Sequence, residues 1–213
     1  MNVERFLEEL PRLFDHFPRS EHPRDRRFAK VLEEVPGLAR ENNLALLNLA
    51  GSLLGAGESY VEIGTYRGTS LIAAALGNAG SFVGIDNFSF RDGTREQLDA
   101  NLERFGVAGA EVIEGDAFEL LRGEALGGKT VGVYYYDNGH QYEQHLDALR
   151  LIEPYLASPA LLIVDDSDWE QVARADRAYL DSQPRARLAL EIVGSGPGQP
   201  WWWEGVHLIA WDA

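Results

Sequence analysis

The sequence predicts an α/β fold in which a doubly wound, seven-stranded and mostly parallel sheet follows an N-terminal helical extension. Two observations lead to this prediction. From residue 59 onward, short apolar runs alternate with segments of helical periodicity, which is the pattern of strand–helix–strand units. Some of these runs are continuous, such as Leu-Leu-Ile-Val at 161–164, and a strand has this composition when helices cover both faces of its sheet.

The N-terminal region shows only helical patterns. Apolar residues at helical spacing predict helices over residues 2–17, 28–35 and 38–54, with a polar, proline-containing loop at 18–27. The Gly-Ala-Gly sequence at 55–57 predicts the end of the third helix. We therefore expect a helical extension over residues 1–55 and the α/β domain over residues 56–213.

The α/β region divides into alternating elements. Strands are predicted at 59–63, 81–86, 110–114, 131–137, 160–165, 187–193 and 205–211. Helices are predicted near 67–78, 93–105, 116–121, 141–156 and 168–181. The last two strands follow each other without a helix, so one of them is expected to be antiparallel. The prediction is a Rossmann-like sheet with one antiparallel strand.

Charge and composition exclude several classes of partner and site. The 213 residues carry a net charge of −15, and such a field repels nucleic acid and anionic membrane surfaces. The absence of cysteine excludes disulfides, thiolate metal sites and cysteine nucleophiles, and it fits a reducing cytosol. No signal peptide and no membrane-spanning apolar run is visible. We expect a cytoplasmic protein with no nucleic-acid or membrane partner. A homodimer stays open.

A glycine turn after the first strand is the most informative segment. Glu62 ends the apolar run, Gly64 and Gly68 follow, and a helical pattern begins at once. Such a turn presents backbone N–H groups and a helix N-terminus to a ligand. Its Gly-x-x-x-Gly spacing differs from the Gly-x-Gly-x-x-Gly of dinucleotide sites. A tight turn without a ligand is the alternative. We expect Gly64→Val to fill ligand space while sparing the fold.

The segment from Glu62 to Ser70 resembles the first motif of class I S-adenosylmethionine (SAM) methyltransferases, with Tyr66 at the middle glycine's position. It is most similar to metal-dependent O-methyltransferases of the catechol, caffeoyl-CoA and macrocin type (methyltransferase family 24-like). The resemblance covers roughly residues 55–213 and implies a seven-stranded sheet with one reversed strand. The predicted SAM-binding residues are Glu62, Gly64, Thr65, Tyr66, Gly68, Ser70, Asp86, Asn87, Phe88, Asp116, Ala117 and Asp137.

Several of these residues have a second interpretation. Asp86 ends the second strand, where a carboxylate can accept hydrogen bonds from ribose hydroxyls, but the same ribose occurs in NAD and in SAM. Asp116 resembles an adenine contact and also fits the N-cap of the following helix. Phe88 could stack on adenine or belong to the core.

Three carboxylates, Asp137, Asp165 and Asp166, follow two strands that are expected to be neighbours. Unpaired, they would repel one another, and a divalent cation resolves the repulsion. Carboxylates suit Mg²⁺, Mn²⁺ or Ca²⁺ rather than zinc. Helix caps and solvent-facing aspartates are the alternative.

The resemblance also implies a general base. His140 stands three residues after Asp137, where catechol-type enzymes often have a lysine and macrocin-type enzymes a histidine. A histidine with a near-neutral pKa can accept the hydroxyl proton as the methyl group moves. The alternative is a surface histidine in the first turn of the helix. His145 is expected to be an exposed helix residue.

The acceptor pocket is expected to form from residues 1–55, 87–95 and 194–204, which follow no motif. Trp201, Trp202 and Trp203 could line an acceptor site, or they could fix a loop to the sheet or form a dimer patch.

The sequence thus predicts a SAM-dependent O-methyltransferase, assisted by Mg²⁺ or a similar cation, that methylates a hydroxyl of a small sugar or phenol. The alternatives are a metal-free methyltransferase and a SAM-binding protein without transferase activity. An NAD(P) oxidoreductase is disfavoured by the spacing of the glycine turn.

Overall fold

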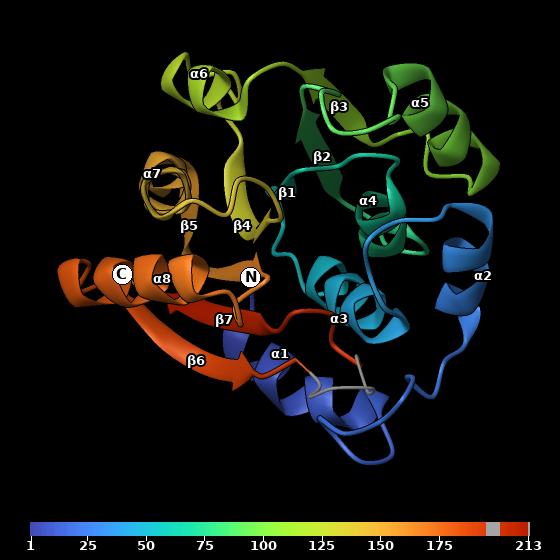
Figure 1. Ribbon diagram of the computed structural model, residues 1–213, viewed down its shortest axis with the longest axis horizontal. Helices are drawn as coiled ribbons and strands as arrows, with labels where there is room; N and C mark the ends of the chain where they lie inside the picture. The colour runs from blue at the N-terminus through green and yellow to red at the C-terminus, as the bar shows by residue number, and fades with distance from the viewer. Residues whose placement is uncertain (195–200, 213) are drawn as a thin grey trace.

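The computed structural model describes residues 1–194 and 201–212. In this part of the chain, seven strands form one sheet in the order β3-β2-β1-β4-β5-β7-β6 (Figure 1). β7 is antiparallel to both of its neighbours, and the other paired strands are parallel. The predicted fold class is therefore confirmed. The strands are β1 (Glu58–Ile63), β2 (Ser81–Asp86), β3 (Glu111–Glu114), β4 (Thr130–Tyr136), β5 (Leu156–Asp165), β6 (Ala186–Ile192) and β7 (Val206–Trp211).

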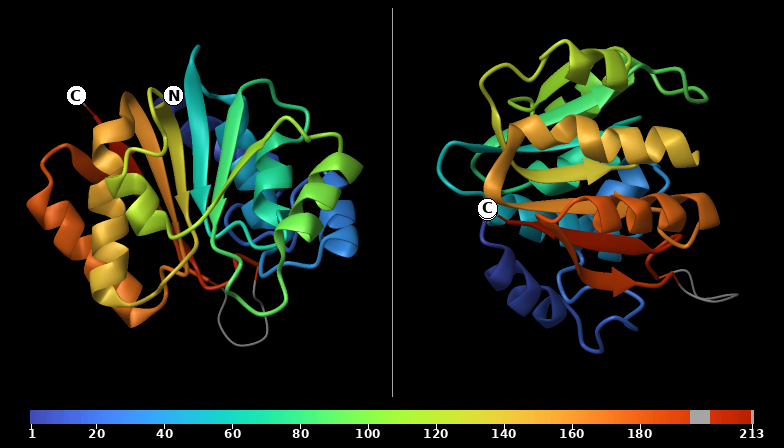
Figure 2. Two further views of the ribbon diagram at one scale, coloured as in Figure 1. Left: turned by 90° about the horizontal axis from the view of Figure 1, so that it is seen from above. Right: turned by 90° about the vertical axis from the view of Figure 1, so that its left-hand side faces the viewer.

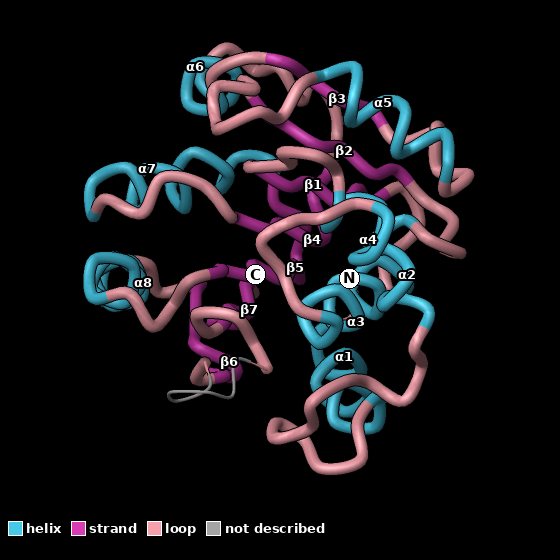
Figure 3. The backbone as a smooth tube through the Cα atoms, turned by 45° about the vertical axis from the view of Figure 1, so that its right-hand side comes forward, coloured by secondary structure: helices cyan, strands magenta, loops and turns pink. Residues whose placement is uncertain are grey.

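Helices cover both faces of the sheet (Figures 2 and 3). One face carries α1 (Val3–Glu9), α2 (Arg27–Glu34), α3 (Glu41–Ser52), α4 (Thr69–Ala75) and α5 (Arg95–Arg104). The other carries α6 (Ala117–Arg122), α7 (Tyr142–Ile152) and α8 (Glu170–Ser182). Successive strand residues point to opposite faces, so Tyr60 packs in the first cluster and Val61 in the second. This two-sided burial explains the continuous apolar runs of the sequence.

Three predicted helices are shorter in the structure than their patterns indicated. α1 gives way to a 3₁₀ turn over Leu10–Leu13, where Pro11 lacks the N–H that an α-helix needs. α7 likewise ends at Ile152, before a 3₁₀ turn that contains Pro154. α3 begins at Glu41, because the Thr69 hydroxyl donates to the Val35 carbonyl (3.0 Å) and holds the preceding segment along α4.

The N-terminal extension is part of the same hydrophobic cluster as the sheet. Phe6, Leu10, Phe28 and Val31 are buried with residues of β1, β4 and β5. Within the described residues, no helix has the length and apolar character needed to cross a membrane.

The sheet order places the carboxyl ends of β1, β2, β4 and β5 along one edge. The loops that follow these strands, residues 64–68, 87–94, 137–141 and 166–169, lie at that edge. In open α/β sheets, ligands bind in the crevice outside this edge.

Candidate active site

The glycine turn after β1 is built by close packing against the loop after β4. Gly64 has φ +95°, and a Cβ there would overlap the carbonyl oxygen of Asp137. Gly68 has φ +91°, and a Cβ there would overlap the Leu98 side chain. The expectation that Gly64→Val spares the fold is therefore wrong, because protein backbone already occupies the space beside Gly64.

Tyr66 takes the position of the middle glycine and has a positive φ of +50°, a conformation that glycine adopts more easily. Its N–H donates to Asp86 Oδ2 (2.6 Å), and the Phe88 N–H donates to Asp86 Oδ1 (2.7 Å). The Asp86 carboxylate thus joins the loops after β1 and β2. Each of its oxygens has a second lone pair, so it can still accept hydrogen bonds from a ligand.

The Glu62 side chain lies beneath the glycine turn and does not line the cavity. It is fully buried and accepts hydrogen bonds from the Tyr60 hydroxyl (2.8 Å) and the Ser70 hydroxyl (2.9 Å). Burial raises the pKa of Glu62 to about 7, although the hydrogen bonds oppose this shift. Ser70 stands between this carboxylate and the cavity.

A cavity of about 410 Å³ lies along this edge of the sheet, within the size range of small-molecule sites. It is lined by nine of the predicted site residues: Gly64, Thr65, Tyr66, Ser70, Asp86, Asn87, Asp137, His140 and Asp166. Six others stand outside the lining: Glu62, Gly68, Phe88, Asp116, Ala117 and Asp165. The SAM contacts of the predicted binding residues stay predictions.

The alternative interpretations of Asp116 and Phe88 both have support. The Asp116 side chain accepts from the Glu119 N–H (2.9 Å) and so caps α6. Phe88 packs against the first hydrophobic cluster, and Ala117 is buried in the second. An N-cap remains compatible with a ligand contact at Asp116.

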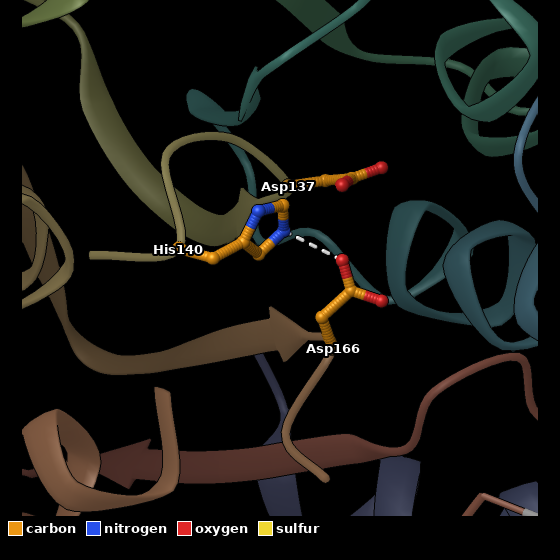
Figure 4. A group of neighbouring side chains, drawn as sticks. All are labelled: Asp137, His140 and Asp166. Atoms are coloured by element: carbon orange, nitrogen blue, oxygen red, sulfur yellow. Dashed lines mark ion pairs between the residues drawn. The ribbon is translucent and has the colours of Figure 1, made fainter. Parts of the chain in front are cut away.

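Asp137, His140 and Asp166 converge from the loops after β4 and β5 (Figure 4). One possible ligand atom from each side chain lies within 4.8 Å of the others. His140 Nε2 is 2.6 Å from Asp166 Oδ2. Among the described residues, the buried Asp166 Oδ1 has no hydrogen-bond partner. Two carboxylates, one of them with a buried, unsatisfied oxygen, fit the chemistry of a site for a hard cation, and the imidazole lies beside them.

Asp165, the third predicted ligand, lies outside this group. Its Oδ2 accepts from the Tyr135 hydroxyl (2.6 Å), and its Oδ1 is 3.5 Å from the Asn43 amide. The same hydroxyl is 3.3 Å from Asp137 Oδ2. The Tyr135 hydroxyl has one proton, which it donates to the nearer carboxylate, that of Asp165. Metal ligation by Asp165 stays a prediction.

The carboxylates of this edge are poorly accommodated as anions. Burial and the charges of Asp165 and Asp166 raise the pKa of Asp137 well above its usual value. Burial and the charge of Asp166 raise the pKa of Asp165 to about 7. The repulsion that the sequence predicted is thus present in the structure, and a bound cation would lower both values.

Comparison with protein families supplies the identity of the domain. A family model described as a methyltransferase domain (methyltransferase family 24) matches residues 61–167, from β1 to just beyond Asp166. The chain belongs to this methyltransferase family. The match spans the glycine turn, Asp86, Asp137, His140 and Asp166, and the predicted class, a SAM-dependent methyltransferase, is confirmed. No curated protein sequence matches the chain significantly.

Solved structures, two of them of O-methyltransferases, share the whole fold. The O-methyltransferase TomG from Streptomyces achromogenes, solved with SAM, is 18% identical, with 100% of each chain covered and a TM-score of 0.67. An O-methyltransferase from Bacillus cereus, in complex with SAH, is 15% identical, covering 99% of this chain and 100% of its own, with a TM-score of 0.64. Cofactor-bound Rv0187 from MTB is 22% identical, covering 98% and 95%, with a TM-score of 0.65. At these identities the similarity shows the fold.

A second prediction about this methyltransferase, the exposure of His145, is also wrong. His145 is not exposed: its exposed fraction is 1%, and its Nε2 lies 2.9 Å from Asp176 Oδ1. His207 Nδ1 lies 2.7 Å from the other oxygen of Asp176. His145 shares a helix face with Leu149 and Ile152, four and seven residues later, and this spacing was a signal of burial.

The tryptophans near the C-terminus have different surroundings. Trp202 is buried, donates from Nε1 to the Pro18 carbonyl (2.6 Å) and makes edge-to-face contacts with Phe14 and Phe17. It therefore fixes the loop to the N-terminal extension, whereas one interpretation expected the loop to be fixed to the sheet. Trp203 instead lines the cavity with φ +53°, and Trp201 packs against the first cluster. Residues 195–200 of the predicted acceptor loop lie outside the described residues.

Other cavity residues were not named individually from the sequence, although Gly37, Leu38, Ala39, Ser89 and Phe90 lie in segments expected to form the acceptor pocket. Gly37, Leu38, Ala39, Thr69, Ser89, Phe90, Tyr135, Asn138 and Gly139 also line the cavity. Leu38 and Ala39 were expected to be helical. Trp169, whose ring lies 4.7 Å from that of His140, is 47% exposed beside the acidic group.

Proposed function

We propose that this methyltransferase transfers the methyl group of SAM to a hydroxyl of a small molecule, a sugar or a phenol, with the assistance of a divalent cation. One observation carries the proposal: Asp137, His140 and Asp166 converge on the same cavity that the glycine turn and Asp86 line. The cavity therefore brings a cofactor subsite and a proton-accepting group together. The similar fold of TomG, solved with SAM, agrees with this assignment.

The cofactor end of the cavity fits SAM. Asp86 has free lone pairs for two ribose hydroxyls, and its place at the end of β2 is typical of that contact. The turn residues Gly64, Thr65 and Tyr66 lie next to Asp86 in the cavity lining. Ser70, in the first turn of α4, also lines this part of the cavity.

The reaction end fits a hard divalent cation, Mg²⁺, Mn²⁺ or Ca²⁺. Asp137 and Asp166 would supply carboxylate oxygens, including the unsatisfied Oδ1 of Asp166. When bound, such a cation lowers the pKa of the acceptor hydroxyl and orients it. His140 then accepts the hydroxyl proton at a ring nitrogen as the methyl group leaves the sulfonium.

A metal-free methyltransferase is a second candidate, and the short His140–Asp166 contact favours it. At 2.6 Å, the Asp166 carboxylate is close enough to orient the imidazole without a cation, although the geometry of this contact is not that of a hydrogen bond. Asp137 would then hydrogen-bond the acceptor. The two candidates differ in whether transfer requires metal.

Methyl transfer from labelled SAM to a panel of phenols and sugars tests the proposal. We expect transfer to require added Mg²⁺ after treatment with EDTA, and Asp137→Asn to weaken metal binding while SAM affinity is retained. Full activity in excess EDTA would select the metal-free candidate. SAM binding without transfer to any acceptor would leave a SAM-binding protein without transferase activity.

The proposal includes a small-molecule partner rather than nucleic acid or a membrane, because the chain carries a net charge of −15. It also includes a cytoplasmic location, which the absence of cysteine fits. A homodimer stays a prediction.

A further inference from the structure

The acceptor end of the cavity lies between the N-terminal extension and the loop before β7. Residues 203–205 are held beside the acidic group, because the Asp168 N–H donates to the Glu204 carbonyl (2.8 Å). From the other side, the Asn43 amide of α3 lies 3.5 Å from Asp165 Oδ1. Leu38, Ala39 and Trp203 line the cavity between these contacts.

An arginine side chain without an ion-pair partner among the described residues lies at this end of the cavity. The guanidinium of Arg40, at the N-cap of α3, lies 5.3 Å from the centre of the Trp203 ring. Among the described residues it has no carboxylate partner. The neighbouring acid, Glu41, is taken by Arg26 (2.9 Å). Arg40 is exposed and does not itself line the cavity, but it stacks on a ring that does, so in a chain of net charge −15 it offers an anion at the cavity mouth a positive charge.

Apolar and aromatic groups supply the surface beside this cation. Leu38 is 37% exposed and the Trp203 ring is half-buried, so both offer area to a flat ligand. Three nearby polar side chains each make a hydrogen bond within the protein. Thr69 donates to Val35 and Ser70 donates to Glu62. The Asn138 side-chain oxygen accepts from the Gly139 N–H (2.8 Å). Their remaining lone pairs and N–H groups could still meet a ligand, so it is the apolar and aromatic surface that favours an aromatic ring over a sugar.

The charges of the cavity also fix an orientation. Without a cation, Asp137 and Asp166 would repel an anionic group placed near His140, and with the proposed cation bound this place is taken by the reacting hydroxyl. A ligand that carries a hydroxyl and an anionic group therefore fits best with its hydroxyl toward His140 and its anionic group toward Arg40.

We propose that the acceptor is a phenol bearing a carboxylate or similar anionic group, with its ring against Trp203 and Leu38 and its anionic group bound by Arg40. This inference rests on the proposed function for its reacting hydroxyl. It narrows the acceptor from any small hydroxylated molecule to an aromatic anion.

Calorimetry with the SAH-loaded protein tests the inference without requiring transfer. The probes are 4-hydroxybenzoate, its neutral analogue 4-hydroxybenzamide, and methyl glucoside. We expect the benzoate to bind about tenfold or more tightly than the benzamide, equivalent to about 1.4 kcal/mol. Arg40→Gln should abolish this preference, and Trp203→Leu should weaken both aromatic probes.

Arg91→Gln is the matched control. Arg91 also stacks on an aromatic ring of the cavity lining, that of Phe90 (4.8 Å), but on the loop that follows Asp86. This variant should keep the preference for the benzoate. Equal affinities for benzoate and benzamide, a preference that survives Arg40→Gln, tighter binding of the glucoside, or no binding of any probe would overturn the inference.

A separate transfer assay distinguishes the two proposals. Arg40-dependent binding of the benzoate without methylation would count against the proposed function alone. Methylation of neutral acceptors without a preference for anions would overturn the inference and leave the proposed function intact.

Discussion

Replacement of Asp176 by alanine should destabilise the protein strongly, because Asp176 joins two histidines in the interior. Its carboxylate is fully buried and contacts His145 of α7 (2.9 Å) and His207 of β7 (2.7 Å). Removing one partner of a buried charged pair typically costs about 3–5 kcal/mol, because the remaining groups stay buried without partners. For a chain of this size, that corresponds to a fall in Tm of roughly 6–20 °C.

The loss should depend on pH in a defined direction. Burial opposes the charged forms, but the Asp176 contact outweighs it and raises the pKa of His207. That contribution is fully present below the unfolded histidine value of about 6.5 and is lost as the pH rises through the folded value. The two histidine contacts likewise outweigh burial and lower the pKa of Asp176. Its contribution is present above about pH 3.9 and is lost as the pH falls through the lowered value.

Urea unfolding at pH 6 and pH 9 measures both effects. We expect Asp176→Ala to lose more free energy of unfolding at pH 6 than at pH 9. Two other acidic residues, Glu191 and Asp168, also interact electrostatically with His207, and both are retained in the variant. Asp181→Ala, which removes an exposed aspartate of the same helix, is the control and should change stability little. A loss below 1 kcal/mol, or a larger loss at pH 9, would refute the reasoning.

Three further predictions concern the site. Asp86→Ala should weaken SAM binding by roughly 1.5–3 kcal/mol for each charge-assisted hydrogen bond lost, and unchanged affinity by calorimetry in the folded variant would remove Asp86 from the cofactor site. Gly64→Val should lower Tm sharply or prevent folding, since its side chain would overlap the Asp137 carbonyl; a wild-type melting curve would contradict this. His140→Ala should cut the transfer rate by about 10²–10⁴ while metal affinity is spared, and full activity at neutral pH would exclude a general-base role.

The sequence by itself determined the sheet, the order of its elements and the reaction class. Strand and helix periodicity are local properties, so seven strands and the antiparallel pairing near the C-terminus could be inferred without coordinates. The carboxyl-edge rule also follows from topology alone, and it placed Asp86, Asp137 and Asp166 on one cavity. Tyr66 could be recognised at a glycine position because motif spacing is read along the chain.

Only the tertiary structure decided which side chains meet. Asp165 and Asp166 are adjacent in sequence, yet one turns inward to Tyr135 and the other toward His140, since successive residues point in different directions. The helical spacing of His145 indicated burial, but its partner, Asp176, lies 31 residues away on another helix and could not be inferred from that spacing. One end of the cavity brings Leu38 and Arg40 close to Trp203, which lies more than 160 residues later in the chain. Such contacts depend on how helices and loops pack over the sheet, and no local pattern in the chain encodes that packing.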